Sequence, residues 1–440
     1  MLKTLRQKKH ILIPAALTLA GIAVLLVFII LAVKPIRERL SYRFEQISTR
    51  IFYIFFPPEK AVFKPEDQQQ TAVAGTLTAI AMITPTSAPA TPIPTGMPSA
   101  TPTLTPTPLP GSVRLSGVRY MDQHGVWNYC APANLAMLLS YWGWEGDRMD
   151  TGRWLKPFEK DKNVMPYEMA DYVREETSLG VIVRSGGTIE LLKALLAGGY
   201  PVLVEKGTYI RETTTGKISW MGHYSVLTGY DDTKGEFNTQ DSFYSPDYPV
   251  SYDTLLQEWR SFNYVFLVVY SQDRERHLLT LLGDYADERK SEEIAAQRAS
   301  QEIYTQSGND QFFAWFNRGT SLVRLQDYYS AAAAYDQAFL LYETLPESTR
   351  PFRIVWYQTG PYFAYYYTGR YQDVINLATT VLEATYEPYL EESFYWRASA
   401  RIALGDQQGA IEDLCQSLKY HPNFIPSTDR LGQLGISNCP

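Results

Sequence analysis

The sequence predicts four parts in order: one membrane-spanning helix, a disordered linker, a domain that mixes helices with strands, and an all-α domain of helical repeats. Three observations predict this order: a long uncharged apolar run near the start, a Thr/Pro-rich tract after it, and an aromatic-rich helical pattern in the last third. With 440 residues and 45% hydrophobic content, the chain can build two or more packed domains. A net charge of -7 argues against a broad nucleic-acid-binding surface.

The first element is a membrane helix. The segment from Ile11 to Val33 holds about 23 residues without a charge, which at the helical rise exceeds the roughly 30 Å hydrocarbon core of a bilayer. Lys34-Pro35-Ile36-Arg37 follows at once, without a convincing small-residue cleavage pattern. We therefore expect a retained anchor over residues 11–33, preceded by a short tail over residues 1–10.

The flanking charges do not decide the orientation, because basic residues lie on both sides of the apolar run. Residues 83–112 form a Thr/Pro-rich tract with too few apolar side chains to pack, and its prolines stiffen it toward extended polyproline conformations. Such tracts commonly serve as stalks outside the cytoplasm. We therefore expect a single-pass protein of the cell membrane with a cytoplasmic tail and extracytoplasmic domains.

Residues 34–82 form a juxtamembrane segment between anchor and linker. Aromatic and aliphatic side chains alternate with arginines from Leu40 to Phe56. This pattern fits an amphipathic segment on the bilayer surface, and it equally fits a continuation of the anchor helix with an aromatic interfacial belt.

A cysteine opens the first helix of the mixed domain. Leu135, Leu138 and Leu139 recur at helical spacing, and Pro132 suits the first turn, where its missing N–H costs nothing. Cys130 thus lies at the helix N-terminus, where unpaired N–H groups and the helix dipole favour a thiolate over a thiol. Taken alone, Cys130 is better read as a small buried hydrophobe, as most free cysteines are.

A histidine and a carboxylate follow on two strands. The segment 221–231 reads as a strand that ends in a Gly/Asp turn, with His223 at its entrance, where a rigidly held imidazole could act as general base. Residues 235–241 would return antiparallel and bring Asp241 close to His223, so that the carboxylate could fix the imidazole tautomer. A histidine on a strand and an aspartate at a strand end also occur commonly in purely structural roles. His124 is the one other candidate for the general base.

Gln123 lies a short step before Cys130. A side-chain amide at this place can join the Cys130 backbone N–H in holding a tetrahedral oxyanion.

Together these residues resemble the papain-like cysteine peptidases related to the bacteriocin leader-processing enzymes. The resemblance rests on Gln123, on Cys130 opening a helix, on Gly222-His223-Tyr224 and on Asp241, with supporting matches from about Val118 to Tyr270. It implies a papain-like α+β fold over residues 113–272 and a catalytic Gln–Cys–His–Asp set. The chain departs from the family pattern at Ala131, where glycine is usual, and at Ser242, where proline is usual.

The C-terminal third resembles tetratricopeptide repeats, in which two antiparallel helices form a unit of about 34 residues. Trp315 with Gly319, and Trp396 with Ala398, occupy the small and aromatic positions of such units, and a looser copy lies between them. We expect this domain over residues 308–435, after a charged helical connector over residues 273–307. Its concave groove could hold a partner protein, or its aromatic side chains could simply pack the core.

The chain has three cysteines. Cys415 and Cys439 could form a disulfide, which would leave Cys130 as the unpaired thiol, or all three could be reduced. Neither a paired-cysteine zinc site nor a phosphate-binding loop is present in the sequence, so we expect no metal and no cofactor.

The leading hypothesis is a membrane-anchored cysteine peptidase that hydrolyses a peptide or protein substrate, with the repeats recruiting a protein partner. Two alternatives stay open. A non-catalytic scaffold would keep the peptidase-like domain without turnover, and an acyl transferase or amidase would use the same thiol with another acceptor.

Overall fold

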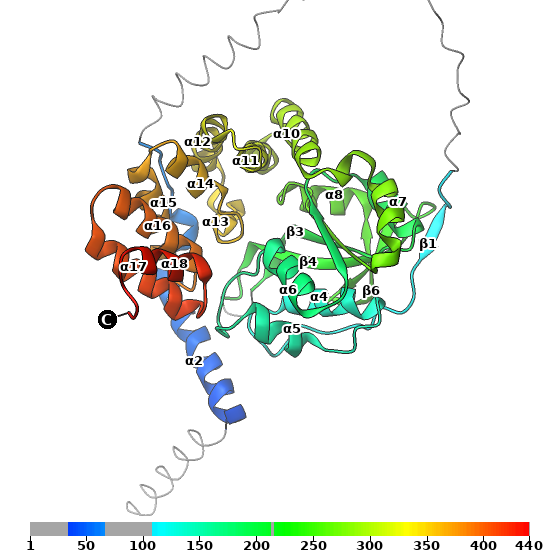
Figure 1. Cartoon of the computed structure of the whole chain (residues 1–440), viewed down its shortest axis with the longest axis horizontal. Coiled ribbons are helices and arrows are strands. Elements are labelled where there is room, and N and C mark those ends of the chain that lie inside the picture. The colour runs from blue at the N-terminus through cyan, green and yellow to red at the C-terminus, as the bar shows by residue number, and fades with distance from the viewer. Residues whose placement is uncertain (1–33, 67–107, 213–214, 440) are drawn as a thin grey trace, which may run out of the picture. The chain divides into compact units, whose positions relative to one another are not determined.

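The computed structural model describes residues 34–66, 108–212 and 215–439 (Figure 1). They fall into two units, the first made of the described residues up to Pro57 with Arg211–Ile218, the second of Pro58–Ile210 with the chain from Ser219 onward. The predicted membrane helix over residues 11–33 and most of the predicted linker lie outside the described residues. Among the residues that are described, no helix is long and apolar enough to cross a membrane.

The first unit contains α2 (Lys34–Phe55). Phe44, Ile47, Ile51 and Ile54 are more than half exposed and recur three and four residues apart, so they line one face of the helix. This is the helix predicted for the juxtamembrane segment.

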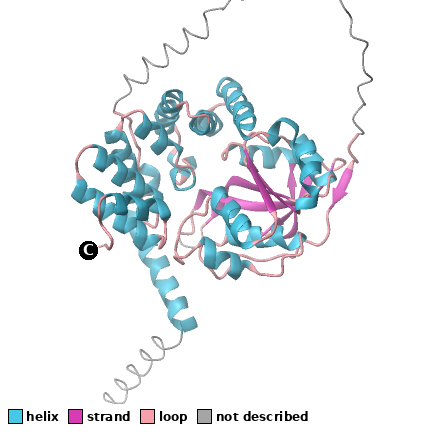
Figure 2. Ribbon diagram, in the orientation of Figure 1, coloured by secondary structure: helices cyan, strands magenta, loops and turns pink. Residues whose placement is uncertain are grey.

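The second unit begins with a short segment and then builds a seven-stranded sheet among the described residues, in the order β2-β7-β3-β4-β5-β6 with β1 added on β4 (Figure 2). The pairs β1/β4, β2/β7, β3/β7, β4/β5 and β5/β6 are antiparallel. The strands are β1 (Ser112–Arg114), β2 (Gly180–Arg184), β3 (Val202–Arg211), β4 (Ile218–Asp231), β5 (Glu236–Asp241), β6 (Ser245–Ser251) and β7 (Phe266–Tyr270).

Both faces of this sheet are buried, because apolar side chains occupy successive positions of the strands. Val202 and Val204 point to one face with Leu227, whereas Leu203 and Val226 point to the other. Helices cover each face and supply the facing leucines. The first face packs on α7 (Ile189–Ala197), α8 (Tyr252–Arg260) and α9 (Glu275–Leu282), and the second on α4 (Cys130–Tyr141), α5 (Arg148–Leu155) and α6 (Pro166–Glu176).

The remaining chain is helical. After two short 3-10 turns and the connector α10 (Glu288–Thr305), neighbouring helices pack as α11 with α12, α14 with α15, and α16 with α17. Their bounds are α11 (Gly308–Arg324), α12 (Tyr328–Thr344), α13 (Ile354–Tyr357), α14 (Gly360–Tyr367), α15 (Tyr371–Glu383), α16 (Glu391–Ala403), α17 (Gln407–Tyr420) and α18 (Ile425–Gln433). That these pairs are tetratricopeptide units stays a prediction. Cys415 and Cys439 form a disulfide that fastens the C-terminus to α17.

The helical region also holds the segment that precedes the linker. Phe63 is buried against Phe339 of α12 and Tyr365 of α14, with ring centroids 4.9 and 6.0 Å away. The backbone N–H of Glu66 donates to Asp373 Oδ1 at 2.7 Å. The chain thus uses part of its own helical surface to bind residues 58–66.

Candidate active site

Cys130 is the first residue of α4. The helix forms because Leu135, Leu138 and Leu139 bury in the core beneath the sheet, and none of them is accessible to solvent. Asn128, two residues earlier, has a positive φ of 45°, a conformation that asparagine tolerates better than most residues. This bend turns the chain into the helix, so that Cys130 stands at the end where backbone N–H groups are free to bind an anion. Since Cys415 and Cys439 are paired, Cys130 is the free cysteine of the described chain.

The structure brings His223 and Asp241 together through the antiparallel pairing of β4 with β5, in which Val226 faces Gln240. His223 Nε2 lies 2.8 Å from Asp241 Oδ1, and both side chains are buried. The strand begins at Ile218, so His223 lies inside it and not at its entrance as the sequence analysis expected. The difference arises because the three residues before Met221 also belong to the strand.

Burial and charge set the protonation of this pair. Burial alone would lower the pKa of His223, but the Asp241 charge, its hydrogen bond and the Cys130 side chain outweigh it and raise the pKa to about 9. Burial alone would raise the pKa of Asp241, but the positive charge of His223 and its hydrogen bond lower it to about 2. At neutral pH the pair is therefore an imidazolium beside a carboxylate.

Lys206 on β3 adds a second positive charge behind the carboxylate. Its Nζ lies 3.9 Å from Asp241 Oδ2 and 3.0 Å from Glu258 Oε2, and the lysine side chain is 2% exposed. The remaining oxygen, Asp241 Oδ1, also accepts the backbone N–H groups of Phe243 and Tyr244. Asp241 Oδ1 is thus held by the imidazole and two backbone N–H groups, whereas Oδ2 has no hydrogen-bond partner among the described residues and faces the Lys206 charge.

Gln123 is positioned by a buried chain of hydrogen bonds. Ser242 Oγ donates to Gln123 Oε1 at 2.7 Å and accepts from Asn134 Nδ2 at 2.7 Å. The same Asn134 amide lies 2.9 Å from the carbonyl oxygen of Cys130. Because Ser242 binds the side-chain oxygen of Gln123, the amide N–H groups of Gln123 take no part in this contact. Ser242, the departure from the family pattern, therefore holds Gln123 and Asn134 in place.

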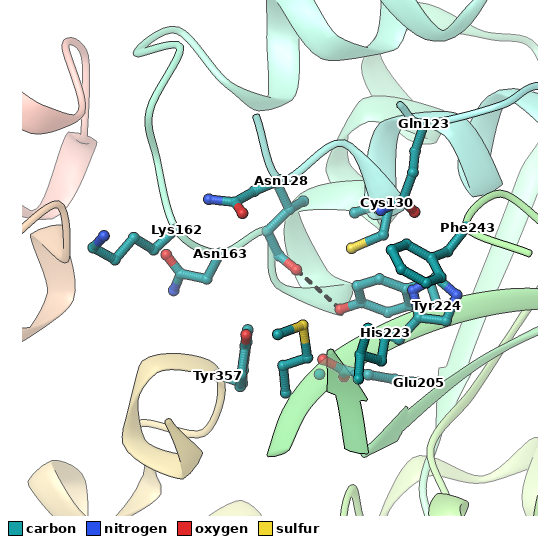
Figure 3. A pocket seen from close by; sticks show the side chains of 15 residues that line it. Gln123, Asn128, Cys130, Lys162, Asn163, Glu205, His223, Tyr224, Phe243 and Tyr357 are labelled. Carbon is teal, nitrogen blue, oxygen red and sulfur yellow. Dashed lines mark hydrogen bonds between the residues drawn. The ribbon is translucent and has the colours of Figure 1, made fainter. Parts of the chain in front are cut away.

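Cys130, His223 and Gln123 line one pocket, with a cavity of about 90 Å³ (Figure 3). Other walls come from distant parts of the chain, as the labelled side chains show: Asn128, Lys162, Asn163, Glu205, Tyr224, Phe243 and Tyr357. The dashed line in Figure 3 marks the bond from the Tyr224 hydroxyl to the Val164 carbonyl at 2.9 Å. Burial raises the pKa of Glu205 well above its ordinary value.

The rival base is not in this arrangement. His124 is exposed, its Nδ1 faces Asp122, and its ring lies on Phe243 with centroids 5.1 Å apart. Of the two candidate histidines, only His223 has a buried carboxylate partner.

Sequence reasoning missed Lys206, Asn134 and Tyr357. The sequence does contain a signal for Lys206 and Asn134. Glu205-Lys206 interrupts an apolar strand, and Asn134 interrupts an apolar helix four residues after Cys130. The sequence contains no such signal for Tyr357. This residue lies in α13 of the helical region, and only the tertiary structure brings it to the pocket. The one group of described residues with metal-ligand spacing, Asp161, Glu391 and His421, is outside the pocket lining.

Comparison with known proteins agrees with the architecture. Residues 115–267 match the family model described as the Peptidase_C39 like family. No curated protein matches the chain. Similar solved structures include a protein described as a C39-like peptidase from Bacillus anthracis, with 19% sequence identity and a TM-score of 0.30, over 37% of this chain and 98% of that chain. Residues 115–267, which are built on an antiparallel sheet, are thus similar to the C39-like peptidase family.

Proposed function

We propose that this chain is a cysteine peptidase in which Cys130 is the nucleophile. The observation that carries the proposal is the convergence of Cys130 and the buried His223–Asp241 pair on one pocket. A thiol at a helix N-terminus beside an imidazolium is the environment in which a thiolate is stabilised. The family match of residues 115–267 supports the same class of reaction.

In the proposed mechanism the Cys130 sulfur attacks the carbonyl carbon of the scissile peptide bond. Since Nε2 of His223 is bound to Asp241, Nδ1 is the nitrogen left to exchange a proton with the sulfur and then to protonate the leaving amine. Asp241 keeps the ring in this tautomer and orientation. The Gln123 amide and the Cys130 N–H would hold the oxyanion, and water then releases the acyl group from the sulfur.

The remaining parts of the proposal concern location and partners. The apolar run over residues 11–33 would anchor the protein in the cell membrane, and the Thr/Pro tract would hold the domain outside the cytoplasm. The helical region would bind a partner protein. Because residues 58–66 already lie on α12, α14 and α15, such a partner would use the surfaces that this segment leaves free.

The test is Cys130→Ser in the full chain purified in detergent. We expect loss of labelling by iodoacetamide and a fall of at least a hundredfold in hydrolysis of a peptide library, followed by mass spectrometry of the products. His223→Ala should lose hydrolysis to a similar extent. His277→Ala, an exposed histidine far from the pocket, is the matched control and should stay active.

If Cys130→Ser retains full hydrolysis, the mechanism is wrong. If the wild-type thiol reacts slowly at neutral pH and no peptide is cut, the non-catalytic scaffold becomes the better description.

A further inference from the structure

Three side chains with metal-ligating atoms meet where the peptidase domain contacts the helical region. Asp161 lies in the loop between α5 and α6, Glu391 is the first residue of α16, and His421 directly follows the last residue of α17. One ligand atom from each lies within 4.8 Å of the others. His421 Nδ1 is 3.0 Å from Glu391 Oε1 and 3.8 Å from Asp161 Oδ2.

Two carboxylate oxygens of this group are buried without a hydrogen-bond partner. These are Asp161 Oδ2 and Glu391 Oε2, and each residue is only 1% exposed. The other oxygens are occupied, since Asp161 Oδ1 accepts the Asn163 N–H and Glu391 Oε1 faces His421. An unsatisfied buried carboxylate oxygen is costly, and two of them beside one imidazole form a set of donor atoms that a bound cation would satisfy.

Another carboxyl group adjoins the site. Glu392 is buried next to Glu391 and has its own unpartnered oxygen, Oε1. The positive charge of the buried Lys156 acts on the Asp161 carboxyl group.

We infer that Asp161, Glu391 and His421 form a binding site for one divalent transition-metal cation of the Zn²⁺ type. At metal–ligand distances of about 2.0–2.2 Å, tetrahedral ligands lie about 3.3–3.6 Å apart, close to the 3.0 and 3.8 Å separations from His421 Nδ1. A nitrogen ligand among two carboxylates favours zinc over calcium and magnesium, which take oxygen ligands.

The cation would connect the helical region to the wall of the Cys130 pocket. Asn128 donates from Nδ2 to the Asp161 carbonyl at 3.0 Å, and Asn163 donates to the Trp356 carbonyl at 2.6 Å. Both asparagines line the pocket. Binding at Asp161 would therefore fix the loop that forms this wall, whether or not Cys130 proves to be a nucleophile.

The experiment measures binding directly in the full chain. The protein is purified in detergent, treated with a chelator and titrated with Zn²⁺ alone, with calorimetry for affinity and elemental analysis for stoichiometry. We expect one Zn²⁺ per chain and a higher melting temperature with the ion. Glu391→Gln, which keeps the side-chain shape, and His421→Ala should each weaken binding at least tenfold. His277→Ala should bind like the wild type.

Two results would overturn the inference: absence of binding to the wild-type chain, or equal affinity in Glu391→Gln and wild type. If His421→Ala fails to fold, the isosteric Glu391→Gln decides. Ca²⁺ added in excess should not displace Zn²⁺, and displacement would exclude a site that depends on the imidazole. Because the readouts are ion content and melting temperature, the result does not depend on peptide hydrolysis.

Discussion

Asp241 determines the charge of the His223 ring, and this has a consequence for stability. The pKa of His223 rises from an ordinary 6.5 to about 9 in the folded protein. A group with a raised folded pKa contributes stability that is complete below the unfolded pKa and is lost as pH rises through the folded value. The contribution, on the order of 3 kcal/mol, should therefore be present below about pH 6.5 and disappear by about pH 9.

We predict that Asp241→Asn removes this dependence. The difference in melting temperature between wild type and Asp241→Asn should be large at about pH 6 and small at about pH 10. Asp232→Asn, a surface change at a Lys193 ion pair, serves as control and should follow the wild-type curve within error. A difference that is equal at both pH values would mean that the buried pair does not carry this charge.

The residues that meet at the site were easier to predict from the sequence than the residues that hold them in position. Cys130, His223 and Asp241 could be found because each occupies a position that local pattern defines: a helix start, a strand and the end of the next strand. Ser242 was taken only as a departure from a pattern, although its hydroxyl orients Gln123. Lys206 approaches Asp241 from another strand, and the spacing of the two residues along the chain does not indicate this contact.

The segment Pro58–Glu66 behaves as part of the helical region although the linker separates the two in sequence. Phe63 fills a site between α12 and α14, and Asn376 of α15 donates to Glu66 Oε1 at 2.8 Å. A buried phenylalanine contributes several kcal/mol through the apolar area that it removes from water. The juxtamembrane chain is therefore fastened to the helices by an apolar anchor.

We predict that Phe63→Ala lowers the free energy of unfolding by about 3 kcal/mol, because the change leaves a cavity against Phe339 and Tyr365. Lys64→Ala is the control, since the Lys64–Glu343 ion pair is exposed and its loss should cost less than about 1 kcal/mol. Denaturant unfolding of both variants measures the difference. Equal effects of the two changes would show that Phe63 does not anchor the segment.

Element types were predictable where the apolar pattern was strong, as in α4 and β4, whose apolar residues are buried at successive positions. The contact of residues 58–66 with the helical region was not predictable. These nine residues mix polar and apolar side chains without a periodicity that would indicate a binding site. The proposed cation site could not be predicted from the sequence for the same reason. Its three proposed ligands lie far apart in the chain, so no local spacing indicates them.

The peptidase domain and the helical region share one apolar core. Trp220 of β4 stacks on Phe262 and on Phe313 of α11, with centroids 5.7 and 5.8 Å apart. Buried polar bonds cross the same boundary: Arg353 donates to the Trp220 carbonyl at 3.0 Å, and Asn317 to the Arg260 carbonyl at 2.6 Å. Buried side chains of the two regions therefore belong to one hydrophobic cluster.

We predict that both regions unfold in a single calorimetric transition, since neither can expose its side of this core without exposing the other. Trp220→Ala should lower the melting temperature and split the transition in two, because it removes the largest ring at the boundary. Trp154→Ala is the matched control. Its ring contacts Tyr172 inside the peptidase domain, so the melting temperature should fall while the transition stays single. Two transitions in the wild-type chain would mean that the pocket wall supplied by Tyr357 can detach, and the helical region would then act as a cover of Cys130 that opens independently.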